Sequence, residues 1–352
     1  LFYGNIKTVL SAKRNKKINI KKISFKGNCQ YKLYNIPNGR LYTDTVNDTA
    51  FIANNSLIKE PSFQFRFKKN LQIVNGLAHK NFVFKNGTPN ILKKIEGNVF
   101  SLLTGGAGKN NYWHWLFDVL PRIGILDKSN FKIKPDYYLL PSLSKHYQKQ
   151  TLLELKIPSS RMINGEKYKH IVCNNLIAVD HPIVFNNNPS KSIINIPIWV
   201  IKWLRKKYIN NSSKNSNSEK KIFINRENDK NLSVRKIINN EEVKNTLKNL
   251  GFKSIILSDL NFKKQVELFK NVDFIIGLHG AGFANMVFSK PGTKLIEIAS
   301  KTSGNIFSGL AKNCKLNYKR IMEKNTLNSL KHQNSHVEVD INKLKRLVLS
   351  FK

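Results

Sequence analysis

Residues 221–322 alternate short apolar runs with amphipathic segments, and this alternation limits the possible folds more than any other feature of the chain. Such apolar runs are typical of buried strands, and the segments between them have helical periodicity. Strands that alternate with helices form parallel βαβ units, so we expect a doubly wound parallel sheet here. The expected strands are 221–224, 254–257, 272–276, 294–298 and 317–322, and the expected helices are 241–250, 262–270, 283–288 and 303–312.

The chain of 352 residues is long enough for two α/β domains. Short strands and loops are expected over residues 1–97, and a strand–loop–helix pattern follows them. The boundaries that we expect are an N-terminal domain at 1–209, a polar linker at 210–220, a second domain at 221–330 and a tail with one amphipathic helix at 331–352.

The expected strand 272–276 runs into a glycine-rich loop with the sequence Gly277-Leu278-His279-Gly280-Ala281-Gly282. In an open parallel sheet, ligands bind at the carboxyl ends of the strands, and glycines there let the backbone approach a phosphate. His279 adds a side chain that can hydrogen bond at the same edge. The loop is therefore a candidate diphosphate site, although a tight turn that needs glycine only for its geometry gives the same pattern.

Two other classes of enzyme have loops whose sequences are similar to this glycine-rich loop. A dinucleotide site needs Gly-x-Gly-x-x-Gly, which this loop does not supply. A hydrolase with such an oxyanion loop needs a Gly-x-Ser-x-Gly elbow. None of the 18 glycines has Ser two residues later. The sequence therefore excludes the hydrolase and disfavours a nicotinamide-dependent enzyme.

Charged residues near the ends of two other strands favour an anion site. Arg226 and Arg235 follow the strand 221–224, in a chain where only ten of the 60 basic residues are Arg. Two arginines at one sheet edge can neutralise a leaving diphosphate. Glu297 falls at the end of the expected strand 294–298, which follows the glycine-rich loop. A carboxylate there can accept hydrogen bonds from ribose hydroxyls; an ordinary surface Glu is the alternative. No Asp-x-Asp pair occurs, so we expect no metal.

The expected helix at 111–126 carries the second candidate site. His114, Asp118 and Arg122 recur every four residues and therefore share one face. His114 is in the first turn, where the helix dipole disfavours protonation, and Asp118 can orient its ring. A neutral, oriented His suits a general base near pH 7. The alternative is a polar stripe with an ordinary Asp118–Arg122 pair.

The formal net charge of +38 predicts attraction to polyanions. An anionic membrane or a phosphate-bearing substrate fits this charge, and a coding bias towards Lys and Asn explains it equally well. The motifs of sequence-specific nucleic-acid modules are missing, so no specific nucleic acid is expected. No apolar run approaches the ~18–20 residues that span a bilayer, and the three cysteines form no disulfide framework. We expect a cytoplasmic protein, at most peripheral at the inner face of a membrane.

Taken together, the motifs resemble glycosyltransferase family 61 of the bacterial capsular or surface-polysaccharide type. The resemblance runs in order from about residue 98 to residue 300, with Ala284 where Thr is common. The matching segments are Asn111–Asp118, Leu120–Arg122, Ile222–Arg226, Arg235, Asn240–Glu242, Leu250–Phe252, Gln265, His279–Gly282, Asn285, Pro291–Thr293 and Glu297.

The resemblance implies a GT-B architecture, in which two Rossmann-like domains face each other across a cleft. It also implies inverting, metal-independent transfer from a nucleotide sugar, with a UDP-sugar the first candidate, to a glycan or lipid-linked acceptor, and no cofactor. His114 supported by Asp118 is the expected base, and the tail helix is expected to pack on the N-terminal domain. A non-catalytic, basic Rossmann-like protein that binds polyanions remains the alternative. The expected donor-binding residues are Arg226, Arg235, His279, Gly280, Ala281, Gly282, Asn285 and Glu297.

Overall fold

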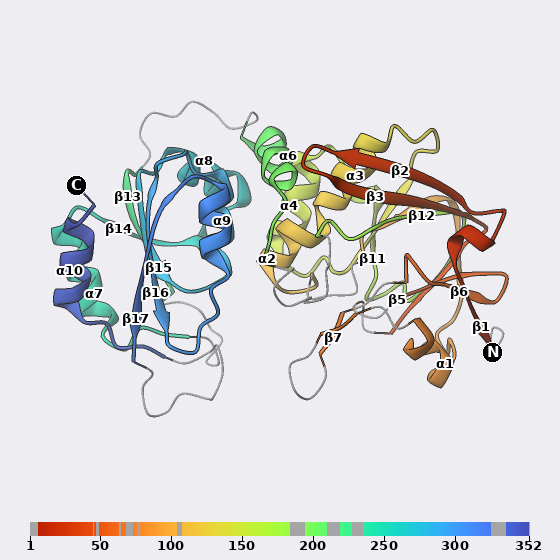
Figure 1. The fold of residues 1–352 in the computed structure, drawn as a ribbon, viewed down its shortest axis with the longest axis horizontal. Coiled ribbons are helices and arrows are strands. Elements are labelled where there is room, and N and C mark those ends of the chain that lie inside the picture. Colours follow the sequence, from red (N-terminus) through yellow and green to blue (C-terminus); the bar gives the residue numbers. More distant parts are fainter. Residues whose placement is uncertain are drawn as a thin grey trace. The chain divides into compact units, whose positions relative to one another are not determined.

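The computed structural model divides the chain into two compact units, Leu1–Trp203 and Leu204–Lys352 (Figure 1). The division falls inside helix α6 (Ile198–Tyr208), a few residues before the expected linker. Most of the expected linker 210–220 lies outside the described residues. The structure describes residues 6–44, 46, 49–62, 65–67, 73–75, 78–103, 108–183, 194–209, 219–226, 235–324 and 336–351.

Unit 1 is built on a mixed 10-stranded sheet with the order β1-β6-β5-β4-β12-β9-β10-β11 and with the β2–β3 hairpin paired to β12. Strands β9 to β12 run parallel to one another, whereas β3 and β4 pair antiparallel with β12. Only this parallel part has the predicted doubly wound pattern. The strands are β1 Thr8–Leu10, β2 Asn19–Phe25, β3 Cys29–Pro37, β4 Arg40–Thr43, β5 Thr49–Ala53, β6 Ser56–Ile58, β9 Lys93–Ser101, β10 Tyr137–Leu140, β11 Met162–Asn164 and β12 His170–Val179, with β7 Phe65–Phe67 and β8 Ile73–Asn75 in a separate hairpin.

Helices of unit 1 follow the parallel strands, as in βαβ units. The segment after β9 is helical from Tyr112 to Ser129, and the segment after β10 includes α4 (His146–Glu154). Strand β12 was not predicted, yet it is the central strand, and Leu176 and Ile177 are fully buried in it. Among the described residues of unit 1, the remaining helices before α6 are α1 Val83–Asn86 and the 3-10 turns Ala12–Arg14, Ala78–Lys80 and Ser159–Arg161.

Unit 2 has the predicted doubly wound sheet. Its five strands are all parallel, in the order β14-β13-β15-β16-β17. Figure 1 shows α7 and α10 on one face of this sheet and α8 and α9 on the other. The α/β class is therefore confirmed. The elements are β13 Lys221–Asn225, α7 Asn240–Asn249, β14 Lys253–Ile256, η5 Leu257–Asp259, α8 Phe262–Asn271, β15 Phe274–Leu278, η6 Ala281–Phe288, β16 Lys294–Ser300, α9 Phe307–Asn313, β17 Asn317–Glu323 and α10 Ile341–Leu349.

The strand order of unit 2 contains a switch point at β13. The chain leaves β13 towards β14 on one side, and β15 lies on the other side of β13. The loops that follow β13 and β15 therefore diverge and leave a crevice at the carboxyl edge, which is where open α/β sheets bind their ligands.

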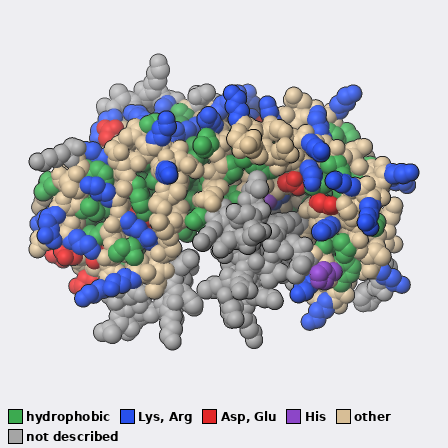
Figure 2. Space-filling view, in the orientation of Figure 1, with side chains coloured by type: hydrophobic (Ala, Val, Ile, Leu, Met, Phe, Trp, Pro, Cys, Tyr) green, Lys and Arg blue, Asp and Glu red, His purple; other side chains and the backbone are tan. Residues whose placement is uncertain are grey.

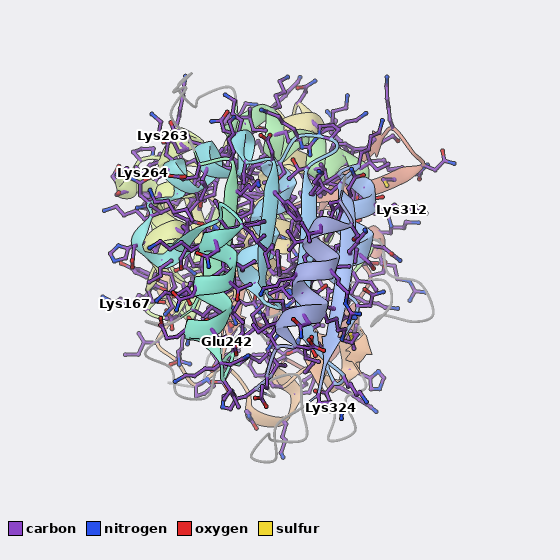
Figure 3. All side chains as sticks on the ribbon, turned by 90° about the vertical axis from the view of Figure 1, so that its left-hand side faces the viewer. Lys167, Glu242, Lys263, Lys264, Lys312 and Lys324 are labelled. Atoms are coloured by element: carbon purple, nitrogen blue, oxygen red, sulfur yellow. The ribbon has the colours of Figure 1, made fainter. Side chains whose placement is uncertain are left out.

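The tail helix α10 packs on unit 2, so the expectation that it packs on the N-terminal domain is wrong. Leu344 and Val348 are buried in one cluster with Val243 and Leu247 of α7. Figure 3 shows α7 and α10 side by side in front of the sheet, with Glu242 at one end of α7. The apolar stripe of α10 covers this face of the sheet, which α7 alone leaves incomplete.

Candidate functional site

The first cluster lies in unit 1, on the helical segment that follows β9. The side chain of Asn111 caps this segment by accepting a hydrogen bond from the backbone N–H of Trp113 at 2.9 Å. The next turn, Trp115–Val119, is a π-helix, closed by a bond of 3.0 Å from the N–H of Leu120 to the carbonyl of Trp115. Such π-turns are rare and are frequent at functional sites. Asp118 of the predicted pair stands in this turn, and His114 immediately precedes it.

His114 and Asp118 form a tight pair of unequal exposure. Nδ1 of His114 lies 2.6 Å from Oδ2 of Asp118, and the side chains are 21% and 2% exposed. Burial lowers the pKa of His114, but the charge and hydrogen bond of Asp118 outweigh burial, so the pKa is raised overall. Burial alone raises the pKa of Asp118. The opposing effect of its basic neighbours is larger, so the pKa is lowered below its usual range; these neighbours are His114, His181 and Arg122. Asp118 is therefore ionised at neutral pH.

This geometry defines the proton arrangement of His114. An ionised carboxylate accepts only, so Nδ1 of His114 carries the proton in their hydrogen bond. In the neutral ring, Nε2 then holds a lone pair that can take a proton from a hydroxyl group. The pair has the arrangement of a general base with an orienting carboxylate.

Arg122 does not form the side-chain pair that the alternative reading expected. Its Nε donates to the backbone carbonyl of Asp118 at 3.2 Å, and its NH1 donates to the carbonyl of Val179 at 3.1 Å. Arg122 therefore ties the helix to the end of β12. His181, which the sequence analysis did not select, lies there with Nε2 at 3.9 Å from Oδ2 of Asp118. The apolar run 176–179, which is followed directly by Asp-His, is the sequence signal that could have indicated His181.

The second cluster lies in unit 2, where the predicted glycine loop follows β15. A Cβ atom at Gly280 would overlap the guanidinium of Arg226, so glycine is needed there to let the arginine cross the loop. Gly282 is close to Leu257, where a Cβ would stand at 3.0 Å from Cδ1. Ala281 and Gly282 are half-buried and begin helix η6. The structure thus brings the arginine after β13 to the loop after β15, as predicted.

Arg235 joins the same loop from the segment before α7. Its NH1 donates to the carbonyl of His279 at 2.6 Å, and its Nε is buried without a hydrogen-bond partner among the residues that the structure describes. Burial, and next the charge of Arg226, together lower the pKa of Arg235 to about 10, and Glu297 opposes them only in part. Arg235 stays charged at neutral pH, close to a second cation, and this favours an anionic ligand.

His279 and Glu297 form a buried pair beneath the loop. Nδ1 of His279 contacts Oε1 of Glu297, the hydroxyl of Tyr318 donates to Oε2, and Nε of Arg320 lies 3.5 Å from Oε1. Burial lowers the pKa of His279; Glu297 opposes this, and Arg235 and Arg320 add to it. The ring is therefore neutral at pH 7.

Besides His279, two more of the predicted donor-binding residues are buried in the interior of unit 2. Glu297 is fully buried, and its carboxylate holds His279 and Tyr318, so the predicted contact with a ribose hydroxyl is not available to it. Asn285 is also fully buried, and its Nδ2 donates to Oε1 of Gln265 at 2.8 Å. Both residues support the loop from below. Tyr318 and Arg320 were missed because they lie on the edge strand β17, whose sequence has no motif.

A pocket of about 330 Å³ opens beside the Arg226 guanidinium at the switch point. Its walls come from the ends of β13 and β15 and from the segment entering α7. The lining combines apolar side chains with amide and charged side chains around the start of α7, and apolar walls with a few polar groups are typical of small-molecule sites. The lining residues are Phe223, Ile224, Asn225, Arg226, Lys236, Ile237, Ile238, Asn239, Asn240, Glu241, Glu242 and Leu278.

The charges around the loop do not balance. Arg235 and Arg320 interact with one buried carboxylate, that of Glu297, and Arg226 adds a further positive charge at the loop. In the described part of the chain, no group of three or more His, Cys, Asp or Glu side chains is placed to hold a metal ion. The arrangement is suited to an anion bound by arginines and backbone N–H groups.

Comparison with known proteins identifies the family. The model of glycosyltransferase 61 matches residues 112–296, a range that begins at the His114 helix and ends beside Glu297. This range is more than half of the chain. The chain belongs to glycosyltransferase family 61. It is therefore a glycosyltransferase, and the alternative of a non-catalytic polyanion-binding protein is set aside.

The other two comparisons add little to the assignment of this glycosyltransferase. No curated protein matches it. Among solved structures, heptosyltransferase WaaC from E. coli, with ADP, matches at 9% identity and a TM-score of 0.37, over 73% of this chain and 100% of the other. A likeness at that TM-score supports no inference about the ligand. No helix in the described ranges is long and apolar enough to cross a membrane.

Proposed function

We propose that this enzyme transfers a sugar from a nucleotide-sugar donor to a hydroxyl group of a glycan or lipid-linked acceptor, with inversion and without a metal. Unit 2 binds the donor, and His114 of unit 1 is the general base, in an enzyme of the GT-B type that the family resemblance implies. The observation that carries the proposal is the convergence of Arg226 and Arg235 on the Gly280 loop, beside a pocket at the switch point.

The donor diphosphate fits the loop side of this site. Arg226 crosses over Gly280, and Arg235 holds the carbonyl of His279 while its Nε stays without a partner among the described residues. Guanidinium groups bind phosphate oxygens through two parallel hydrogen bonds. The neighbouring pocket of about 330 Å³ has apolar walls and amide groups that suit the nucleoside.

The reaction needs one proton transfer and one displacement. Nε2 of His114 takes the proton of the acceptor hydroxyl, and the oxygen attacks the anomeric carbon as the bond to the diphosphate breaks. A single in-line displacement inverts the anomeric configuration. Asp118 keeps the ring in the required tautomer and stabilises the imidazolium that forms. The arginines stabilise the charge that develops on the leaving diphosphate, which is the task that a metal performs in other enzymes.

The positive charge supports a place at the cytoplasmic face of a membrane, in surface-polysaccharide or capsule synthesis. Figure 2 shows Lys and Arg side chains spread over the face in view, with few acidic side chains between them. A net charge of +38 attracts the enzyme to anionic headgroups, where a lipid-linked acceptor resides. A UDP-sugar is the first donor to test.

A thermal-shift screen with UDP-, GDP- and CMP-sugars tests the proposal. The matching donor raises the melting temperature, because a ligand that binds only the folded state stabilises it. The same donor then serves in a transfer assay, in which His114→Asn abolishes transfer but keeps the donor-induced shift. No shift with any nucleotide sugar would contradict the donor site, and near-normal transfer by a folded His114→Asn enzyme would contradict the base.

A further inference from the structure

Asp118 faces two histidines, and the proposed function uses only one of them. Oδ2 of Asp118 lies 2.6 Å from Nδ1 of His114 and 3.9 Å from Nε2 of His181. The side chain of His181 is 4% exposed, against 21% for that of His114. His181 is therefore screened from an acceptor, whereas His114 can be reached.

The backbone determines which nitrogen of His181 carries its proton. Nδ1 of His181 accepts a hydrogen bond of 3.1 Å from the N–H of Ile183. Burial lowers the pKa of His181 to about 3, and Asp118 only partly opposes this, so the ring is neutral near pH 7. With Nδ1 as the acceptor, the single proton of the neutral ring is on Nε2, the atom that faces Asp118.

The other charged groups at this corner are already engaged or point elsewhere. Asp180, the neighbour of His181, turns towards β3, where it accepts from the N–H of Lys32 at 2.7 Å and from the hydroxyl of Tyr34 at 2.9 Å. Arg122 binds the backbone carbonyls of Asp118 and Val179. His181 is thus the side chain from the end of β12 that faces the Asp118 carboxylate.

The topology explains why the three residues meet. Strands β9 and β12 are parallel neighbours, so their carboxyl ends lie together. The chain leaving β9 forms the helix with His114 and Asp118, and the chain leaving β12 reaches His181 at once. The π-turn at Trp115–Val119 sets the position of Asp118 between them.

We propose that His181 is a positioning residue, which directs its Nε2–H at Asp118 and so holds the carboxylate in place beneath His114. This inference rests on the proposed role of His114 as the base. The N–H dipole of His181 stabilises the ionised carboxylate and disperses part of its negative charge. His181 therefore limits how far the charge of Asp118 raises the pKa of His114. With a less raised pKa, more of His114 is neutral and can act as a base.

The test measures the pKa of His114 by NMR in full-length protein with isotope-labelled histidine, assigned through His114→Asn. His181→Asn keeps an acceptor for the N–H of Ile183 but has no donor that reaches Asp118, whereas His181→Gln places an amide N–H near the position of Nε2. The matched control is His170→Asn, which removes a buried histidine from the other end of β12, where Nδ1 lies 2.7 Å from the carbonyl of Asn90.

We expect His181→Asn to raise the pKa of His114 by about 0.5 unit or more, because the Asp118 carboxylate loses the N–H dipole that faces it at 3.9 Å. His181→Gln should restore most of the wild-type value, and His170→Asn should leave it unchanged. If His181→Asn does not fold, His181→Met, which fills the space without a donor, takes its place.

Three results would overturn the proposal: an unchanged pKa of His114 without the donor, an equal rise in the Gln variant, or an equal rise in the His170 control. The measurement needs no substrate. A failure to find sugar transfer would therefore count against the proposed function and leave this coupling between His181 and Asp118 standing.

Discussion

At the scale of single residues, the space above Gly280 decides whether Arg226 can reach the loop. Gly280→Ala places a methyl group where the guanidinium lies, so Arg226 must withdraw. The loss of its charge-assisted hydrogen bonds to a diphosphate should weaken donor binding by about 10- to 100-fold. Isothermal titration with the donor nucleotide measures this change.

Gly304→Ala is the control for that substitution. A Cβ there meets nothing closer than Ile306 Cγ1 at 3.7 Å, so the same added methyl group should leave affinity unchanged. Equal affinity of the Gly280→Ala and wild-type proteins would show that Arg226 does not bind the donor across this glycine.

Asp118 controls both the tautomer and the pKa of His114. Because the general base acts in its neutral form, transfer should fall as the pH drops through the pKa of His114, which Asp118 raises above the ordinary value of 6.5. Asp118→Asn removes that effect and leaves burial, which lowers the pKa. The acid limb of the rate profile should therefore move to lower pH, and the rate on its plateau should fall by about 10²- to 10⁴-fold.

A pH–rate profile of both proteins checks this expectation. A midpoint that stays in place or rises in Asp118→Asn would contradict the assignment of His114 as the base oriented by Asp118.

Some residues that the sequence predicted for the site lie where a ligand can reach them and others are buried, and the difference has a physical reason. Arg226 and Gly280 come within two residues of a strand end, and His114 lies in the helix that follows β9, so all three are outside the strands themselves. Glu297 was expected at the end of a strand, but β16 continues to Ser300, so its side chain points into the sheet. The sequence did not mark this end because the residues after Glu297 are also apolar or small.

At the scale of elements, the sequence predicted unit 2 better than unit 1. The strands of unit 2 are continuous apolar runs, and all five were predicted. In β12, the polar Asn174 and Asn175 interrupt the run, and the pairing with β9 shifts register between Cys173 and Asn175. This register shift falls at the polar residues of a central strand, and neither the shift nor the π-turn has a signature in the periodicity.

The tail helix should stabilise unit 2 through its apolar stripe. Leu344 of α10 is fully buried, and Leu349 of the same helix is 63% exposed. Leu344→Ala should lower the free energy of unfolding by about 2–5 kcal/mol. Leu349→Ala, which removes the same atoms from the exposed side, should change it by less than about 0.5 kcal/mol.

Urea unfolding of the two variants gives the comparison. A similar loss for both, or none for Leu344→Ala, would mean that α10 does not pack against α7 and the sheet as described.

At the scale of the whole molecule, the spread of positive charge over the surface is the dominant feature (Figure 2). We expect the protein to sediment with vesicles that contain phosphatidylglycerol at 50 mM salt and to be released as salt rises, since screening shortens the range of surface charges to ~3 Å at 1 M. Vesicles of phosphatidylcholine alone are the control. Equal binding to both lipids, or binding that salt does not affect, would contradict an electrostatic membrane contact.

The central claim is that the arginine-lined loop of unit 2 binds a nucleoside diphosphate without a metal. Isothermal titration of UDP, GDP and CDP into the full-length protein in EDTA tests it directly, with Arg226→Gln and Arg235→Gln as variants. The account predicts that one of the three nucleotides binds in EDTA and that each variant weakens its affinity by about 10-fold or more. Binding that requires added magnesium, or that both folded variants retain in full, would contradict it.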